Sequence, residues 1–255
     1  MKSIQIKREL RKKKKILSLL QQVSALDETI IEYSIKSKDP LFKKIEISFK
    51  KALSCETKLS NEIIKMNGLS GRKFRIMLNQ LVNRIQNPRY LEIGSWLGST
   101  ACSACFSNKL KITCIDDWSQ NFNENLIPKD EFNKNIKKVI TENIQLNLIQ
   151  KNFREIDFSN IGKHNIYLYD GGHTYNDHFD AIDKVLPALT KKFILIIDDW
   201  NWKQVRQATN DAIKKNSLKL ISQISIRTTR DDSSALITSE NSDWHQGCSF
   251  IILYK

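Results

Sequence analysis

The chain lacks the features of a membrane protein or a secreted protein. It holds no apolar run near the length of about 20 residues that a membrane-spanning helix needs, and no apolar segment follows its basic amino terminus as a secretory signal would require. Its five cysteines are odd in number and fall mostly in predicted buried elements, which argues against a disulfide framework. We therefore expect a protein of the reducing cytoplasm with free thiols. Its 255 residues suffice for one domain with a full core and an appendage.

Two further patterns concern a zinc site and a nucleic-acid partner, and we expect neither. Cys102-x-x-Cys105 has no second pair to complete a zinc site, and both cysteines fall one turn apart on a predicted helix, so we interpret them as small buried residues. The net charge of +13 is uneven, because residues 1–15 hold eight basic side chains and one acidic. Such a tail could attract nucleic acid or an anionic membrane surface. We favour a solvated helix end, since lysine is abundant throughout, and nucleic acid is not the expected partner.

The most informative segment is residues 89–100. It predicts a short buried strand, Tyr90–Ile93, then a turn that contains Gly94 and Gly98, and then a helix. In open α/β sheets a cofactor binds in the crevice at the carboxyl ends of the strands, where such a turn lets the backbone approach it closely. A second strand about twenty residues further on ends at Asp116, which is placed to bind a ribose diol.

This glycine turn lacks the spacing of the common phosphate-binding loops. A dinucleotide site needs Gly-x-Gly-x-x-Gly, but Ser95 stands where the second glycine would be. No Gly-Lys-Ser/Thr follows, as it would in a P-loop. The alternative to a cofactor site is an ordinary packing turn between a strand and a helix, with no ligand.

Two later predicted strands also end in acids. Asn165–Asp170 is a strand-like run that is followed by a glycine turn, and the unbroken apolar run Phe193–Ile197 leads into Asp198 and Asp199. An unbroken apolar run is typical of a central parallel strand that is covered on both faces. The other elements predicted here are a helix at Asn176–Leu189 and strands at Asn152–Ile156, Leu218–Ile226 and Ser249–Tyr254.

These motifs carry a family resemblance. Glu92-x-Gly94-x-x-x-Gly98 resembles the first motif of class I S-adenosylmethionine-dependent methyltransferases, whose cofactor carries no phosphate. The segments Tyr169–Tyr175 and Ile196–Trp200 are similar to those of metal-dependent small-molecule O-methyltransferases, including the sugar O-methyltransferases of antibiotic pathways. The resemblance covers roughly residues 70–255. It implies an α/β fold with a Rossmann-like, seven-stranded, mostly parallel sheet, helices on both faces and an antiparallel last strand.

The resemblance implies that S-adenosyl-L-methionine binds at the glycine turn. It places Glu92 near the methionine end of the cofactor, implies that Gly94 leaves room for it, and assigns the ribose hydroxyls to Asp116. The other positions expected at the cofactor are Ser95, Trp96, Gly98 and Ser99 in the turn, Asp117 and Trp118 after the ribose acid, and Asp157 after the predicted third strand.

The resemblance also implies a magnesium-like ion held by Asp170, Asp198 and Asp199. Hard oxygen ligands suit Mg²⁺ or Mn²⁺, and such an ion lowers the pKa of a hydroxyl that it binds. An alternative for Asp199 is that it caps the helix that follows it.

The expected catalytic residues are His173 and Asp170. His173 lies three residues past Asp170, and its imidazole is suited to accept a proton near pH 7. The sugar O-methyltransferases more often carry another acid where this chain has Gly172-His173. The alternative for His173 is a turn histidine that bonds to the backbone or faces water.

Residues 1–69 predict a helical extension that precedes the methyltransferase-like domain at 70–255. A break falls at Asp39-Pro40, the helical pattern resumes over residues 41–66, and Ser70 fits an N-cap for the next helix. The apolar residues at helical spacing before the break are Leu17, Leu20, Val23, Ile30 and Ile31. Such an extension covers the substrate side or pairs with another subunit, which leaves a homo-oligomer open.

Residues 119–129 and 228–247 are long and polar, as active-site lids tend to be. The candidates for the rim of the substrate site are Trp96, Trp200, Trp202 and Trp244. We therefore expect a methyltransferase that acts on an oxygen of a small hydroxylated molecule or sugar with help from a divalent ion. The alternatives are a nucleic-acid methyltransferase and a cofactor-binding scaffold that does not catalyse. Against the first, the turn after Asp170 lacks the paired prolines of enzymes that methylate base amino groups.

Overall fold

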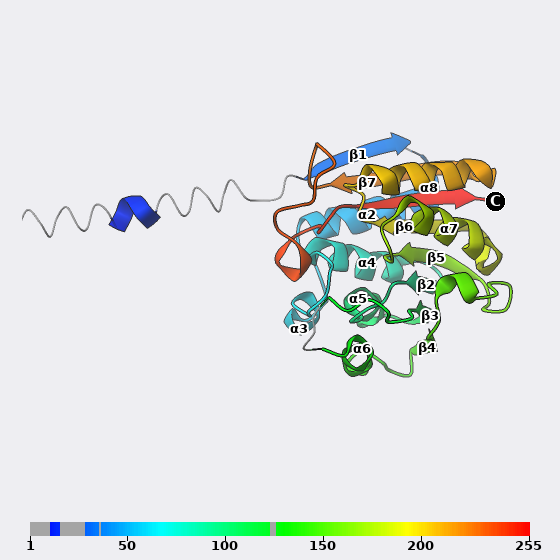
Figure 1. The fold of residues 1–255 in the computed structure, drawn as a ribbon, viewed down its shortest axis with the longest axis horizontal. Helices are drawn as coiled ribbons and strands as arrows, with labels where there is room; N and C mark the ends of the chain where they lie inside the picture. Colours follow the sequence, from blue (N-terminus) through cyan, green and yellow to red (C-terminus); the bar gives the residue numbers. More distant parts are fainter. Residues whose placement is uncertain (1–10, 16–28, 36, 123–125) are drawn as a thin grey trace, which may run out of the picture.

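The computed structural model describes residues 11–15, 29–35, 37–122 and 126–255. An eight-stranded sheet with the order β1-β7-β8-β6-β5-β2-β3-β4 forms its centre, and helices lie on both faces (Figure 1). The strands are β1 (Ile30–Ile35), β2 (Arg89–Ile93), β3 (Leu110–Ile115), β4 (Ile144–Ile149), β5 (His164–Tyr169), β6 (Leu189–Asp198), β7 (Lys219–Arg227) and β8 (Cys248–Tyr254). The helices are α2 (Pro40–Leu53), α3 (Asn61–Ile64), α4 (Arg72–Arg84), α5 (Ser99–Cys105), α6 (Pro128–Ile136), α7 (Tyr175–Val185) and α8 (Lys203–Lys215).

The strand pairing confirms a mostly parallel α/β sheet with an antiparallel last strand. β2 pairs in parallel with β3 and β5, and β8 runs antiparallel to both β6 and β7. The register aligns the carboxyl ends of the central strands, because Ile93 is level with Ile115 and Tyr169, and Tyr169 is level with Ile197. The residues that follow these four therefore emerge side by side at one edge of the sheet.

The unbroken apolar run of β6 is explained by cover on both faces, as predicted. Leu195 and Ile197 belong to the buried cluster on the face with α7 and α8. Ile194 and Ile196 belong to the cluster on the opposite face, with α2, α4 and α5. Because side chains alternate along a strand, a strand buried on both faces needs apolar residues at every position.

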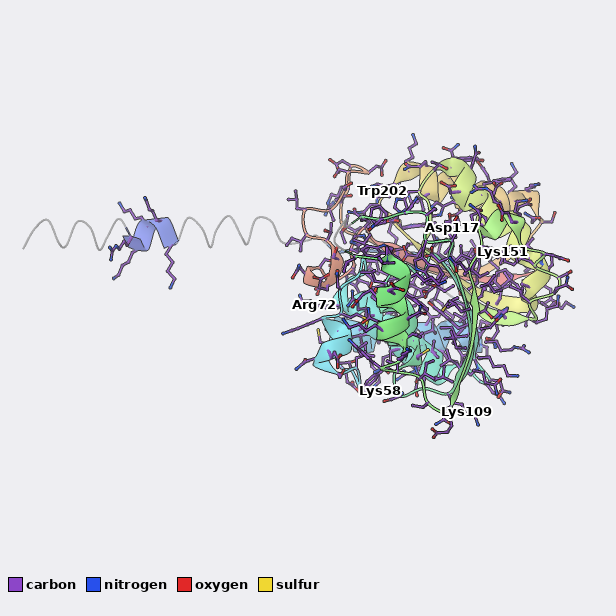
Figure 2. The ribbon with its side chains drawn as sticks, turned by 60° about the horizontal axis from the view of Figure 1, so that its bottom comes forward. Lys58, Arg72, Lys109, Asp117, Lys151 and Trp202 are labelled. Atoms are coloured by element: carbon purple, nitrogen blue, oxygen red, sulfur yellow. The ribbon has the colours of Figure 1, made fainter. Side chains whose placement is uncertain are left out.

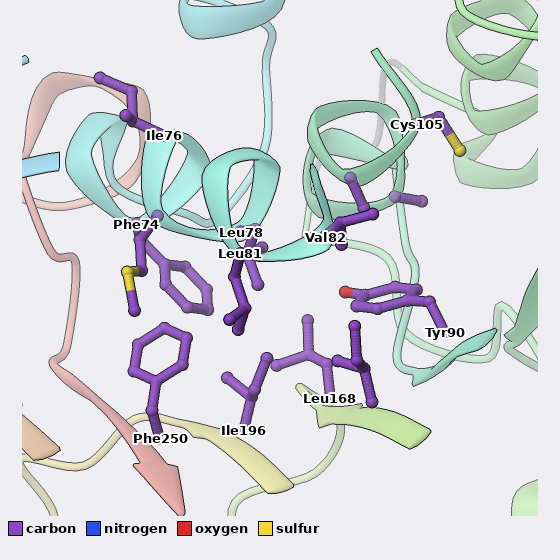
Figure 3. Close-up of a cluster of buried hydrophobic side chains, with 14 of the residues drawn as sticks. Phe74, Ile76, Leu78, Leu81, Val82, Tyr90, Cys105, Leu168, Ile196 and Phe250 are labelled. Carbon is purple, nitrogen blue, oxygen red and sulfur yellow. The ribbon is translucent and has the colours of Figure 1, made fainter. Parts of the chain in front are cut away.

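The larger cluster joins the sheet to α4. The rings of Phe74 on α4 and Phe250 on β8 meet edge to face with centroids 6.1 Å apart. Figure 3 shows Leu81 above Ile196 in this cluster, and Val82 close to the ring of Tyr90 from β2. This apolar face accounts for the helical spacing that the sequence shows after residue 70.

The sheet has one strand more than the seven predicted. Ile30 and Ile31 lie in β1, which pairs antiparallel with β7, instead of continuing a helix. β-Branched isoleucines favour a strand where a sheet edge is available, and helical spacing over two residues is weak support for a helix. Residues 41–66 form α2 and the single turn α3 instead of one helix, and Leu17, Leu20 and Val23 lie outside the described residues.

The predicted third strand was also misplaced. Residues 152–156 contain a short 3₁₀ turn, Phe153–Glu155, that Asn152 caps through its side chain. The true third strand is β4, whose sequence alternates between apolar and polar residues as an edge strand does.

Ser70 does not cap α4. Gly71 is the N-cap residue, and the Ser70 hydroxyl is buried beside Arg75 and Ser99. The first amide groups of α4 donate instead to main-chain oxygens of Ser242 and Asp243. The carboxyl-terminal part of the chain thus supplies the cap that the local sequence does not.

Within the part of the chain that the structure describes, none of the helices is long and apolar enough to cross a membrane.

Candidate active site

A pocket opens at the edge of the sheet where the carboxyl ends of β2, β3 and β5 meet. The glycine turn after β2, the segment after β3 and the turn after β5 form its walls, and Asn152 to Arg154 close one side. Asp117 and Lys151, which Figure 2 labels, are among its lining residues. The predicted residues that line it are Gly94, Ser95, Trp96, Ser99, Asp116, Asp117, Asp170 and His173. This is the position at which open α/β sheets bind their ligands.

The glycine turn is tightly held by its neighbours. Gly94 has φ +90°, and a Cβ there would overlap the main-chain oxygen of Asp170, so the chain itself needs this glycine. Gly98, at φ +85°, is the left-handed N-cap of α5 and lies against the Phe132 ring outside the pocket lining. Trp96 between them also has a positive φ, +39°. A large non-glycine residue in this conformation is uncommon, and such strain gathers at ligand sites.

Asp116 joins the glycine turn to the next strand. Its carboxylate accepts hydrogen bonds from the main-chain N–H of Trp96 at 2.8 Å and of Trp118 at 2.7 Å. Burial raises the pKa of Asp116, and these hydrogen bonds oppose the rise. Each carboxylate oxygen can still accept a second hydrogen bond, so Asp116 can hold the turn and a ribose hydroxyl together.

Glu92 lies below the pocket and is fully buried. Its Oε2 accepts a hydrogen bond from the Tyr90 hydroxyl at 2.7 Å, whereas its Oε1 lacks a partner among the described residues. Burial raises the pKa of Glu92 to about 7, and the Tyr90 hydrogen bond limits the rise. Ser95 Oγ and Trp96 Nε1 are also buried and unpartnered in the described part of the chain. Glu92 lies in β2 and the other two residues lie in the turn, and the hydroxyls of Ser95 and Thr100 also lower the pKa of Glu92.

The three acids predicted to bind a metal are neighbours, but among the described residues the group whose ligand atoms all lie within 4.8 Å of one another is Asp198, Asp199 and His245, without Asp170. The carboxyl groups of Asp170 and Asp198 interact directly, and Asp199 is next to both. Burial, followed by the charges of the neighbouring carboxylates, raises the pKa of both Asp170 and Asp198 well above the usual range. Both carboxylate oxygens of Asp198 are buried, and the groups that act on them are the carboxyl group of Asp170 and the main chain of Asp199. Clustered acids without cations carry a large cost that a bound cation would relieve.

Asp199 is not a helix cap. It has φ +57°, and α8 begins at Lys203 with Trp202 as its N-cap residue. Its Oδ2 lies 2.9 Å from Nε2 of His173. Burial favours the neutral imidazole, but the hydrogen bond and charge of Asp199 outweigh burial and raise the pKa of His173. The His173 ring also meets the Trp202 ring at 4.8 Å, so the turn histidine has specific partners.

His245, which the sequence did not indicate, lies beside the acid pair. One ligand atom each from Asp198, Asp199 and His245 fall within 4.8 Å of one another. However, Nδ1 of His245 accepts a hydrogen bond from the main-chain N–H of Ser239 at 2.9 Å. Because Nδ1 is an acceptor, the proton of the neutral ring is on Nε2, which therefore cannot bind a metal ion. In a metal-bound histidine, the nitrogen that does not bind the metal usually donates a hydrogen bond, but here Nδ1 accepts one. We therefore assign His245 as an N–H donor near the acids. No local motif marks it in the sequence.

Several predicted residues lie away from the pocket. Asp157 is exposed and bonds to Ser159 and Asn160 in its own turn, because the strand it was expected to follow lies elsewhere. Trp118 lies outside the lining and packs edge to face on Phe132, although its indole N–H donates to the Trp96 carbonyl.

Of the four tryptophans expected at the substrate rim, two belong to the core. Trp200 is buried on the α7 and α8 face, and Trp244 is fully buried against Phe49 of α2. Trp96 and Trp202 remain partly exposed near the pocket and the acids.

The segment at 228–247 is anchored, unlike a free lid. Thr228 and Asn201 exchange two hydrogen bonds, and Asp232 forms ion pairs with Arg206 and Arg227. These contacts fix the segment that carries His245 beside the acid pair. The segment therefore forms a wall of the site.

Comparisons with known proteins agree with this geometry. Residues 91–200 match a protein family described as "Methyltransferase domain". No curated protein sequence matches the chain. The matched segment runs from β2 to the end of the acid pair and so contains the glycine turn, Asp116, Asp170, Asp198 and Asp199.

Solved structures resemble the chain only distantly. A methyltransferase from Streptococcus mutans is 14% identical with a TM-score of 0.47, and the alignment covers 71% of this chain and 48% of that one. The S-adenosylhomocysteine-bound Podospora anserina methyltransferase PaMTH1 is 11% identical, with a TM-score of 0.47 and coverage of 87% and 91%. TrmN from Thermus thermophilus is 11% identical, with a TM-score of 0.43 and coverage of 81% and 52%. The chain thus spans about half the length of the first of these structures.

At these identities and scores the three structures carry no argument about substrate or partner. The family match is a separate finding and covers every residue that lines the pocket except Leu69. Residues 91–200 therefore match a methyltransferase domain, which supports the expectation of a class I S-adenosylmethionine-dependent methyltransferase.

Proposed function

We propose that this protein transfers the methyl group of S-adenosylmethionine to an oxygen of a small hydroxylated molecule, with a divalent cation held by Asp170, Asp198 and Asp199. The observation that carries the proposal is the shared position of two features. A pocket and a cluster of buried acids lie beside each other at the carboxyl ends of adjacent parallel strands. Asp170 belongs to both, because it lines the pocket and interacts with Asp198.

The pocket residues fit the cofactor. Asp116 retains acceptor capacity for the ribose hydroxyls, since its two main-chain partners use one lone pair on each oxygen. Ser95 and Trp96 line the pocket, and their buried polar atoms would meet polar groups of the amino-acid end, whereas Glu92 lies outside the lining and would act through its charge. A buried carboxylate near a cationic sulfonium and an ammonium group would regain its charge, which gives the orphaned Glu92 oxygen a role.

The acid cluster fits a hard divalent cation. Asp198 and Asp199 offer carboxylate oxygens within 4.8 Å of each other, and Asp170 interacts with Asp198. The third member of the 4.8 Å group, His245, is not assigned as a ligand, because its Nδ1 accepts a hydrogen bond from Ser239. When bound, Mg²⁺ or Mn²⁺ would orient a substrate hydroxyl and lower its pKa.

The chain's own residues supply alignment and proton removal. His173 is held by Asp199 on one side and by the Trp202 ring on the other, at the mouth of the pocket. In this position its imidazole can accept the proton that the hydroxyl loses as the methyl group arrives. Alignment of the hydroxyl with the methyl carbon lowers the barrier further, because a bimolecular encounter becomes a step within one complex.

The cofactor proposal is tested by binding. We expect S-adenosylhomocysteine to raise the melting temperature, because a ligand that binds only the folded state stabilises it; at 100 times Kd the gain is about 2.7 kcal/mol. The variant Asp116→Ala should lose most of the shift. The absence of any shift at saturating ligand, in protein shown to be folded by circular dichroism, would refute the cofactor site.

The metal proposal is tested at Asp198, which is fully buried and does not line the cofactor pocket. We expect Asp198→Ala to abolish methyl transfer to hydroxylated acceptors while S-adenosylhomocysteine still binds. Mn²⁺ should raise the melting temperature of the wild type but not of the variant. Unchanged turnover of the wild type in chelator-treated buffer would rule out the metal role.

A further inference from the structure

A buried arginine outside the pocket organises one of its walls. Arg75 on α4 has no exposed surface, and its guanidinium donates to main-chain oxygens of the segment that leads to α4 and to the Ser70 hydroxyl. These oxygens belong to Ile63, Ile64, Met66 and Gly68. Among the described residues no carboxylate lies within ion-pair distance of Arg75, but the charge of Glu240 acts on it. Burial lowers the pKa of Arg75 to about 10 and the charge of Glu240 opposes the fall, so the side chain remains charged at neutral pH.

The arginine reaches the cofactor pocket through two hydroxyl groups. Its Nε donates to Ser70 Oγ at 2.9 Å, and Ser70 Oγ lies 2.9 Å from Ser99 Oγ. Ser99 lines the pocket at the start of α5, directly after the glycine turn. Gly68 packs directly against the Ser99 hydroxyl, because a Cβ at Gly68 would overlap Ser99 Oγ. The connecting segment, residues 63–70, is therefore fitted closely to the pocket wall.

The positions of the protons follow from burial. If Ser99 donated to Ser70, the Ser70 proton would need another acceptor, and in the described chain Ser70 has no exposed surface and no further partner. If Ser70 donates to Ser99, every polar group of the buried Ser70 is satisfied, and only the Ser99 proton remains. Ser99 is 6% exposed and borders the pocket, where a ligand or water can accept that proton.

We propose that Arg75 and Ser70 are positioning residues that turn the Ser99 hydroxyl into a hydrogen-bond donor for the carboxylate of the bound cofactor. This inference rests on the proposed function, since it requires S-adenosylmethionine in the pocket. The guanidinium of Arg75 lies two hydroxyls away from the pocket, and its positive charge favours an anionic group at the end of the chain of hydrogen bonds. The segment before α4 thereby selects which end of the cofactor the glycine turn accepts.

The test compares two ligands that differ in the carboxylate. S-Adenosylhomocysteine carries it, whereas 5′-methylthioadenosine keeps the nucleoside and the sulfur but lacks the amino-acid group. We expect Ser70→Ala to weaken S-adenosylhomocysteine binding by about tenfold or more in isothermal titration calorimetry, as for loss of a hydrogen bond to a charged group. Binding of 5′-methylthioadenosine should change less than about twofold. Ser99→Ala should show the same selective loss, and the double variant should lose little more than either single one.

Two controls separate positioning from a structural role. Ser70→Thr keeps the hydroxyl and should restore affinity for S-adenosylhomocysteine. Ser103→Ala removes a buried hydroxyl on the same helix that bonds to the Ser99 main-chain oxygen, and it should leave the ratio of the two affinities unchanged.

Failure of the positioning role and failure of the proposed function give different results in this test. An equal loss for both ligands in Ser70→Ala and Ser99→Ala, or no loss for either, would overturn the assignment. A wild-type protein that binds neither ligand would instead refute the proposed function, and the assignment with it.

Discussion

Residues at the ends of strands carry most of the predicted chemistry, and burial decides how they behave. Asp116 and Asp170 directly follow parallel strands and Asp198 is the last residue of one, so the sequence placed all three at the carboxyl ends of the strands. The sequence does not show that Asp198 is fully buried beside the carboxyl group of Asp170, or that Glu92 has no exposed surface. Protonation at this site depends on those environments, since desolvation disfavours the charged form of a carboxyl group.

The raised pKa of Glu92 predicts how the free energy of unfolding depends on pH. Its pKa of about 7 lies above the ordinary value of 4.5, so the folded state holds a proton that the unfolded state releases between these values. The resulting stability is fully present below pH 4.5 and is lost as the pH rises through 7. Glu92→Gln has no such loss. We expect its free energy of unfolding, relative to the wild type without ligand, to increase between pH 5 and pH 8 by on the order of 2 to 3 kcal/mol.

Urea denaturation at the two pH values measures this difference. Binding of S-adenosylhomocysteine should meanwhile become weaker in Glu92→Gln, because the ionised carboxylate is lost. A difference between variant and wild type that does not change with pH would contradict the assignment of the titration to Glu92.

At the scale of elements, local sequence predicted well the elements that are buried on both faces. The bounds expected for the strand before Gly94 and for the run at Phe193–Ile197 lie within β2 and β6. Edge elements were less predictable. β1 and β4 lie at the two edges of the sheet, where the apolar pattern is weaker because one strand partner is missing, and β4 is the third strand that the sequence placed at residues 152–156.

The first N–H groups of α4 are capped by residues that lie far away in the sequence, Ser242 and Asp243. Gly71 has φ −75°, which alanine adopts readily, but a Cβ there would overlap the main-chain oxygen of Asp243. We expect Gly71→Ala to lower the free energy of unfolding by about 1 to 3 kcal/mol, as overpacking does. Chemical denaturation measures the loss.

Asp243→Ala is the matched control for the α4 cap. It removes the ion pairs of the same residue with Arg72 and Lys73, which are partly exposed and worth about 0 to 1 kcal/mol. Because the cap uses the main-chain oxygen, this variant should cost less than Gly71→Ala. The reverse order would show that the side chain, and not the main chain, holds the two segments together.

At the scale of the whole molecule, segments far apart in the sequence share one core. Trp244, in the anchored segment at 228–247, is fully buried against Phe49 of α2, and its neighbours in that cluster come from α4 and the sheet. The residues before the matched family segment and those after it therefore pack together on one face of the sheet (Figure 1).

Trp244→Ala tests this continuity. Loss of a buried tryptophan costs about 3 to 5 kcal/mol, which corresponds to a fall in melting temperature of roughly 6 to 20 °C for a chain of this length. We expect one cooperative transition at the lower temperature when circular dichroism and calorimetry are compared. Leu236→Ala in the same segment, where the side chain is 82% exposed, should change stability by less than about 0.5 kcal/mol. Two separate transitions in Trp244→Ala would indicate independent units.

The sequence by itself determined the glycine turn, the acids after the strands and the mostly parallel sheet, because strand and turn patterns are local and parallel strands end at a common edge. Only the tertiary structure decided the edge strand β1, the cap of α4 from Asp243, the His245 beside the acids and the link from Arg75 to Ser99. Each of these joins residues far apart in the chain, and no local pattern encodes such a contact. The fold alone brings the two partners together.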